Sequence, residues 1–173
     1  MRFPRQITHV GYAVPNLPAA AGEWADRFGA GPFIALPPAS FELIEHRGEP
    51  ATFEHQAAFG QWGPIAVELQ QIEAARPERV AVALSPPEGA INHVSYMVGE
   101  LGEERARLEQ LGMAGLLYAR SGPVELSVHE APMLGHPVEL HQRSDFLVEF
   151  FAMVERQSRD WNGRDPIRDL PGD

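Results

Sequence analysis

The segment Ile7-Thr8-His9-Val10-Gly11-Tyr12-Ala13-Val14 returns 84 positions later as Ile91-Asn92-His93-Val94-Ser95-Tyr96-Met97-Val98. Five of the eight positions are identical. Both copies are rich in β-branched and aromatic residues. They also alternate, so that the central valine and tyrosine share one strand face while the histidine takes the other. The sequence therefore predicts two equivalent strands, each opening one half of a duplicated chain.

Each half continues with the same order of elements. Apolar residues at helical spacing follow each strand, over about 17–28 and 101–111, and Gly29 and Gly112 end the two helices. Each half closes with a hairpin whose second strand carries Val-Glu-Leu, over 67–71 and 138–142, after strands expected over 52–59 and 124–130. A Gly/Pro turn precedes each Val-Glu-Leu strand, Gly63-Pro64 in the first half and Gly135-His136-Pro137 in the second, and a turn within 60–63 is the other possibility for the first hairpin. The Pro-rich stretch 36–50 is expected to hold the 13 extra residues of the first half as a loop.

These patterns predict a single domain, residues 1–173, made of two modules. The first module covers 5–72, a linker covers 73–89, and the second module covers 90–143. A strongly apolar helix is expected over 145–162, with Asp145 near its N-cap, Asn162-Gly163 at its end and a loose tail from Pro166. This helix would cap the second module or form a dimer contact, and its phenylalanines could instead line a substrate mouth.

The composition removes several kinds of chemistry. The chain has 24 acidic and 14 basic residues, all the basic ones are arginine, and there is no cysteine. A thiolate nucleophile, a cysteine-ligated metal and a lysine Schiff base are therefore excluded. The net charge of −10 disfavours nucleic acid and anionic membrane surfaces as partners. Without an apolar stretch near 18 residues or a signal region, we expect no membrane span and a cytoplasmic location.

The repeat also places metal-competent side chains at equivalent positions. His9 with Glu68 and His93 with Glu139 form two such pairs. If the modules pack about a pseudo-twofold axis, the four side chains converge on that axis. Two imidazoles and two carboxylates suit a divalent ion such as Zn, Ni, Co, Fe or Mn and leave positions open for water or substrate.

The pattern Ile-x-His-Val-x-Tyr with Val-Glu-Leu, present twice between Ile7 and Gln142, resembles the vicinal oxygen chelate superfamily. That superfamily includes glyoxalase I, methylmalonyl-CoA epimerase, extradiol dioxygenases and bleomycin-resistance proteins. The run Asn16-Leu17 through Phe28-Gly29-Ala30-Gly31-Pro32-Phe33 is most similar to the epimerase-like and glyoxalase-like branch. Epimerases often have glutamine at the position of Glu68, so this ligand set is slightly more similar to that of glyoxalase.

The resemblance implies an α+β fold in which two tandem βαβββ modules form curled mixed sheets around a shared metal cleft, followed by the C-terminal helix. It implies His9, Glu68, His93 and Glu139 as ligands of a divalent metal ion. The expected function is proton transfer next to a carbonyl that the ion polarises, by an isomerase, epimerase or glyoxalase-like lyase acting on a small molecule. We expect a homodimer. The alternatives are a metal-free binding or resistance protein and, less favoured because of the fourth ligand, a ring-cleaving dioxygenase.

The general base is open between two residues. The resemblance suggests Glu139, displaced from the ion as in glyoxalase-like members. His55 is the other candidate: if Phe59 paired with Pro64, His55 would lie opposite Glu68 on the metal-facing side, and a slip of one residue would turn it away.

Several other side chains could have either a functional role or a purely structural or surface role. Glu54 is a weaker candidate base, because an epimerase glutamate lies on this strand but does not align securely. Glu125 is read as cavity-lining or solvent-facing. His129 with Ser127 forms a polar stripe for which the wet side of an edge strand is favoured slightly. Arg47 and Arg120 could hold an anion, but we favour solvated surface charges. The aromatic residues near the expected mouth, many of which could be core, are Phe33, Phe53, Phe59, Trp62 and Phe146.

Overall fold

The structure is a computed structural model that describes residues 6–80 and 89–170. The first half contains β1 (Ile7–Ala13), α1 (Leu17–Phe28), β2 (Phe33–Ala35), β3 (Leu43–His46), β4 (Glu49–Pro50), β5 (Thr52–Trp62) and β6 (Ile65–Arg76). The second half contains β7 (Ile91–Val98), α3 (Leu101–Gln110), β8 (Gly115–Ser121), β9 (Val124–His129) and β10 (Val138–Gln142), followed by α4 (Asp145–Ser158) and β11 (Ile167–Asp169).

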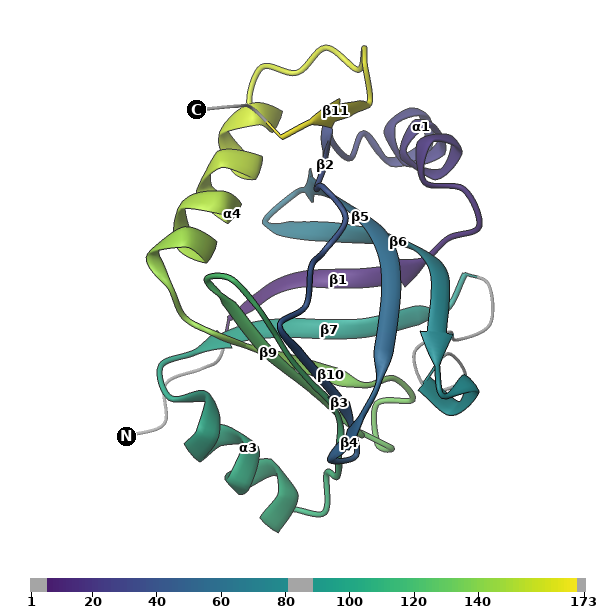
Figure 1. Cartoon of the computed structure of the whole chain (residues 1–173). Helices are drawn as coiled ribbons and strands as arrows, with labels where there is room; N and C mark the ends of the chain where they lie inside the picture. Colours follow the sequence, from purple (N-terminus) through teal and green to yellow (C-terminus); the bar gives the residue numbers. More distant parts are fainter. Residues whose placement is uncertain (1–5, 81–88, 171–173) are drawn as a thin grey trace.

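The described strands form one mixed sheet in the order β11-β2-β5-β6-β1-β7-β10-β9-β8-β3-β4. Within each half the first and last strands pair in parallel, β1 with β6 and β7 with β10, and the halves join through the antiparallel pair β1–β7. The sheet curls so far that β3, near one edge, contacts β5 of the other wing (Figure 1). The expected α+β class with a curled mixed sheet and a C-terminal helix is confirmed.

Local sequence signals set the ends of α1. Asn16 Oδ1 accepts a hydrogen bond from the Ala19 N–H at 2.9 Å, which caps the first turn. Gly29 ends the helix in the left-handed region with φ of 63°, where a side chain is unfavourable. The apolar face of α1 packs on the outer face of the sheet, in a buried cluster that includes Leu17, Ala21 and Leu69.

The Pro-rich stretch 36–50 is more ordered than expected. Part of it forms β3 and β4, and β3 pairs with β8, so a segment of the first half extends the outer edge of the second. The Leu43–Arg120 and His46–Leu117 pairs define this register. The expectation of a loop is therefore wrong for this part, because the alternating stretch after Pro38 finds a free strand edge to pair with.

The hairpin β5–β6 turns at Gly63-Pro64, as the Gly/Pro signal predicts, and not at the other possibility within 60–63. Gly60 lies inside β5, where a Cβ would come within 2.8 Å of Phe33 Cδ1, so glycine serves close packing rather than a turn. The strand β6 continues to Arg76, which makes the first residues of the expected 73–89 linker part of the sheet. Residues 81–88 of that linker lie outside the described residues.

The C-terminal segment also differs from expectation. Ser144 is the N-cap of α4 and accepts from Leu147 N–H at 3.2 Å, Asp145 is its first residue, and the helix ends at Ser158. It packs on β5 and β6 of the first half rather than capping the second. The tail is not loose, since β11 pairs in parallel with β2. None of the helices that the structure describes is long and apolar enough to cross a membrane.

Candidate metal centre

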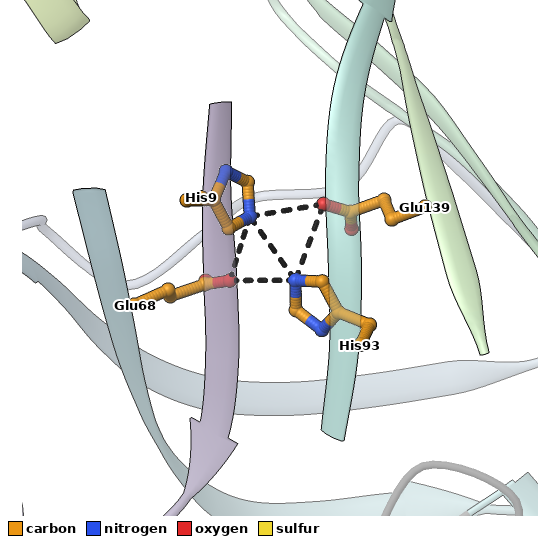
Figure 2. Close-up of side chains that lie close together, drawn as sticks. All are labelled: His9, Glu68, His93 and Glu139. Carbon is orange, nitrogen blue, oxygen red and sulfur yellow. Dashed lines mark hydrogen bonds and ion pairs between the residues drawn. The ribbon is translucent and has the colours of Figure 1, made fainter. Parts of the chain in front are cut away.

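Four side chains from the four central strands meet on the concave face of the sheet. His9 comes from β1, Glu68 from β6, His93 from β7 and Glu139 from β10. Each offers one nitrogen or oxygen atom, these atoms lie within 4.8 Å of one another, and all four residues are buried. Figure 2 shows the four side chains pointing toward one another. The pairing of equivalent strands therefore brings together the residues that the repeat singled out.

The spacing of these atoms fits one ion. His9 Nε2 lies 3.0 Å from His93 Nε2 and 3.3 Å from the Oε2 atoms of both Glu68 and Glu139. His93 Nε2 lies 3.1 Å and 3.4 Å from the same two oxygens. Ligand atoms about 2.1 Å from an ion lie roughly 3.0 Å apart at adjacent octahedral positions and roughly 3.4 Å apart in a tetrahedron. Five of the six separations among the four donors thus match those around a single divalent ion, and all four donors lie within 4.8 Å of one another.

The partners of the outer imidazole nitrogens favour metal-competent tautomers. His93 Nδ1 lies 2.9 Å from Asn92 Oδ1, an acceptor, so Nδ1 carries the proton. The Thr8 hydroxyl donates its proton to the Ser95 carbonyl at 3.1 Å. Thr8 Oγ1 can therefore only accept from His9 Nδ1, which lies 3.5 Å away. Both Nε2 atoms then present lone pairs to each other. Such an arrangement is repulsive unless a cation or a proton lies among them.

The two buried carboxylates also require a positive charge nearby. Burial alone raises the pKa of Glu139, but the imidazoles of His141, His93 and His9 outweigh it and lower the pKa to about 2. Burial also opposes ionisation of Glu68, yet His9 and His93 hold its pKa well below the usual range. Glu139 Oε2 is buried and receives no hydrogen bond from the described residues. Two ionised carboxylates therefore share a buried site in which one oxygen lacks a donor.

The pKa of His9 is shifted by the same contacts, in the opposite direction from the pKa values of the two carboxyl groups. Burial lowers the pKa of its imidazole, but contact with Glu139 and Glu68 outweighs burial and raises the pKa to about 9. In the absence of a metal ion, a proton on this imidazole supplies part of the missing positive charge. The donor set and its electrostatics together fit a divalent cation bound only by nitrogen and oxygen.

Gly11 makes room for one of the four donors. It pairs with His93 across the β1–β7 junction, and the His93 ring lies directly over its Cα. A Cβ at Gly11 would lie 2.6 Å from Nδ1 and 2.8 Å from Nε2 of His93. The equivalent position in the second repeat is Ser95, which pairs with His9 and does carry a side chain. The glycine in the first repeat is thus required by the position of His93.

Sequence reasoning missed three polar side chains around the cluster. Gln70 donates to Glu68 Oε1 at 3.0 Å, and Asn92 orients His93 as described above. His141 is buried, and its Nδ1 lies 3.2 Å from Ser95 Oγ and 3.6 Å from Glu139 Oε2. The strand period could have found two of them, because Gln70 and His141 lie two residues beyond Glu68 and Glu139 and share their face.

The cluster opens into a cavity of about 350 Å³. Glu68, His93 and Glu139 line it, and most of the remaining wall is aliphatic or aromatic. Helix α4 contributes Phe146, Leu147, Phe150 and Phe151 to this wall. The ring of Phe151 stacks on His9 with centroids 5.5 Å apart, so α4 covers the site directly. The interpretation of the α4 phenylalanines as cavity lining fits this geometry.

His55 lines the cavity, although in a different register from the one considered. Phe59 pairs with Glu68 and His55 pairs with Ile72, with a bulge between Glu54 and His55. The side chain of His55 nevertheless lies on the cavity side, close to the Phe53 ring, with its buried Nδ1 unpaired among the described residues. Burial is the main reason that its pKa is lowered, which favours the neutral imidazole. Glu54 is exposed on the opposite face and does not line the cavity.

The remaining candidates lie away from the cavity. Glu125 is half-buried and accepts from the Tyr118 hydroxyl at 2.6 Å. His129 and Ser127 bond each other at 3.1 Å and are fully buried, so the interpretation as a wet strand face is wrong. Their face of β9 lies against α3, which excludes solvent.

The two arginines considered as anion holders are paired on the surface. Arg47 binds Glu130, and Arg120 lies 3.3 Å from Glu42. Among the aromatic residues expected at the mouth, Phe53, Phe59 and Phe146 line the cavity. The other two, Phe33 and Trp62, pack elsewhere: Phe33 in the cluster beneath α1, and Trp62 against Trp24.

Comparison with known proteins agrees with this architecture. Residues 8–125 match the family model described as the glyoxalase/bleomycin resistance protein/dioxygenase superfamily. The ethylmalonyl-CoA/methylmalonyl-CoA epimerase of Cereibacter sphaeroides is 28% identical over 151 residues, which cover 79% of this chain and 91% of that protein.

Solved structures show the same fold at low identity. Methylmalonyl-CoA epimerase from Mycobacterium tuberculosis aligns with a TM-score of 0.54 and 17% identity over 86% of this chain and 97% of that one. A hypothetical protein from Bacillus halodurans C-125 aligns with a TM-score of 0.56 and 12% identity over 83% and 97%. Because the family model matches more than half of the sequence, the chain belongs to the glyoxalase/bleomycin resistance protein/dioxygenase superfamily.

Proposed function

We propose that this protein is a divalent-metal-dependent enzyme that moves a proton at the carbon next to a carbonyl group, as an isomerase, an epimerase or a glyoxalase-like lyase. The observation that supports it best is the buried cluster of His9, Glu68, His93 and Glu139 at a largely apolar cavity. The superfamily contains enzymes, and the similar epimerases act on small acyl-CoA molecules, which favours a small-molecule substrate here.

Each part of the site has a role in this reaction. His9, Glu68, His93 and Glu139 would hold the ion, which when bound supplies Lewis-acid stabilisation of negative charge on the substrate oxygen. The apolar walls and α4 exclude water, so charges on the site residues interact more strongly. Proton transfer falls to a side chain within reach of the substrate carbon, and His55 and Glu139 are the two candidates.

His55 is the better candidate for the base. Its imidazole faces the cavity, its Nδ1 has no hydrogen-bond partner among the described residues, and burial keeps it neutral. A neutral imidazole can take the proton and return it to the same or a neighbouring carbon. Glu139 can act only if it leaves the ion, which removes one of the four donors.

Metal content tests the first part of the proposal. Protein purified without added metal should contain about one equivalent of a divalent ion, by elemental analysis, and His9→Ala should lose it. The matched control is His136→Ala, which removes a half-buried histidine outside the cluster. Protein without a bound ion, or the same content in His9→Ala, would refute the metal site and favour the alternative of a metal-free binding protein.

Isotope exchange tests the reaction. Under nitrogen in D₂O, deuterium should enter 2-hydroxy ketones, hemithioacetals or branched thioesters at the carbon next to the carbonyl. His55→Gln should keep its metal and lose this exchange. Exchange that persists in His55→Gln would assign the base to Glu139. Turnover that requires oxygen would instead identify a ring-cleaving dioxygenase.

A further inference from the structure

The walls of the cavity carry almost no charge. Among the described residues that line it, the only acidic side chains are Glu68 and Glu139, and no arginine is present. The chain has no lysine at all. The described lining therefore offers no arginine or lysine side chain to a substrate anion.

A divalent ion held by the cluster would not give the cavity a surplus of positive charge. Its two positive charges are matched by the carboxylates of Glu68 and Glu139, so the loaded site is close to neutral. A carboxylate or phosphate elsewhere in the cavity would lose its hydration without gaining a counterion, which is strongly unfavourable. Arg47 and Arg120, the arginines considered as anion holders, face away and are paired with Glu130 and Glu42.

The mouth of the cavity is apolar as well. Pro37, Pro38 and Pro123 lie on the loops that border it, and α4 adds Phe146, whose ring stacks on Phe150. Phe146 is 46% exposed although it lines the cavity, so it lies where a ligand enters. Apolar walls with few polar groups are typical of sites that select an apolar body and orient it by one polar end.

We propose, resting on the metal-dependent function above, that the substrate is an uncharged small molecule with an aromatic or branched apolar body, selected through α4, and with one polar end that reaches the metal cluster. Acyl-CoA thioesters of the kind handled by the similar epimerases carry several phosphates. They meet no unpaired cation among the described residues of this cavity. Helix α4 lies beyond the 8–125 segment that matches the family model.

A series of hydroxamates tests this selectivity with a constant chelating end. Titration of the Co²⁺-loaded protein, followed by the visible spectrum of the ion, compares acetohydroxamate, benzohydroxamate and 4-carboxybenzohydroxamate. Benzohydroxamate should bind at least about tenfold more tightly than acetohydroxamate, because the phenyl ring is buried, and the added carboxylate should reverse that gain. A carboxylate derivative that binds as tightly as benzohydroxamate would overturn the proposal.

Variants of α4 assign the effect to the wall. Phe146→Ala should weaken benzohydroxamate roughly three- to tenfold and leave acetohydroxamate unchanged. Val148→Ala is the matched control, since Val148 is an exposed residue of the same helix that does not line the cavity. Equal effects of the two variants, or an effect of Phe146→Ala on both ligands, would contradict the role of α4.

A metal-free comparison separates this inference from the proposed function. If the protein takes up no Co²⁺, the proposed function fails, and binding of benzamide and benzoate is then measured by saturation-transfer NMR. Benzamide binding without benzoate binding still supports an uncharged apolar ligand. Benzoate binding as strong as that of benzamide overturns it.

Discussion

Replacing Gly11 with alanine should weaken metal binding although position 11 supplies no ligand. The new Cβ would lie 2.6 Å from Nδ1 and 2.8 Å from Nε2 of His93, whereas ordinary contacts begin at 3.4 Å. Cε1 of the same ring would lie closer still, so the ring must move by more than about 0.8 Å, several times the ~0.2 Å by which a metal–nitrogen distance varies. Forcing one methyl into a packed site costs about 1–3 kcal/mol. If this cost falls on the loaded state, the dissociation constant of the ion rises roughly 5- to 150-fold.

Competition with a fluorescent chelator measures that constant, and the Co²⁺ absorption spectrum reports whether His93 remains a ligand. Ser95→Ala is the matched control, because it changes the equivalent position of the second repeat without adding an atom. It removes only the hydroxyl 3.2 Å from His141 Nδ1. Urea unfolding of the metal-free forms checks that both variants fold.

The reasoning is refuted if Gly11→Ala binds Co²⁺ with wild-type affinity and an unchanged spectrum. Weakening of the same size in Ser95→Ala would also refute it, since the effect would then come from the strand junction in general rather than from the His93 ring.

Three further outcomes are expected. Chelation of the ion should lower the melting temperature. Loss of a ligand present at about 100 times its Kd lowers the free energy of unfolding by about 2.7 kcal/mol, and it leaves two buried carboxylates without a cation. Equal calorimetric midpoints with and without chelator would contradict this expectation. Burial is the main reason that the pKa of His129 is lowered, so the unfolded chain binds a proton below about pH 6.5 that the folded chain does not. Stability should fall as the pH drops through that value, and urea unfolding at pH 7.5 and 5.5 should show a smaller fall for His129→Gln; identical falls would count against it. Ser144→Ala removes the N-cap of α4 and should cost about 1 kcal/mol in urea unfolding, a loss that an unchanged midpoint would contradict.

The repeat carries most of the fold and the ligand set. His9 and His93 occupy equivalent positions, and so do Glu68 and Glu139, so equivalent strand pairing brings all four to one point. This part was predictable because it depends on strand period and on internal symmetry, both of which are visible in the sequence.

The position of His55 could not be predicted in the same way. A hairpin register depends on where the chain turns, and the glycines at 60 and 63 both favour a turn. Packing of Phe33 against Gly60 decides between them, and that contact is between residues far apart in the sequence. The alternation of side chains along a strand correctly predicts that His55 faces the cavity. It does not predict how far along β5 His55 lies from the position opposite Glu68.

The docking of α4 was equally hidden. Its helical pattern and Ser144 cap are local, but several of its apolar side chains could face either half of the sheet. The aromatic cluster of Phe59, Phe150 and Phe151 fixes it over His9, and no sequence period records such a contact.

The pairing of β3 with β8 has a consequence for the order of folding. Leu43 finds its partner, Arg120, only after most of the chain has been made, and the contacts of high sequence separation that close the sheet form slowly. During synthesis the first half carries His9 and Glu68 with an unfilled apolar face and an unpaired segment before β5. The cavity can therefore be completed only late in folding, and release of the nascent chain before β8 and α4 would leave a half-site prone to association with other chains.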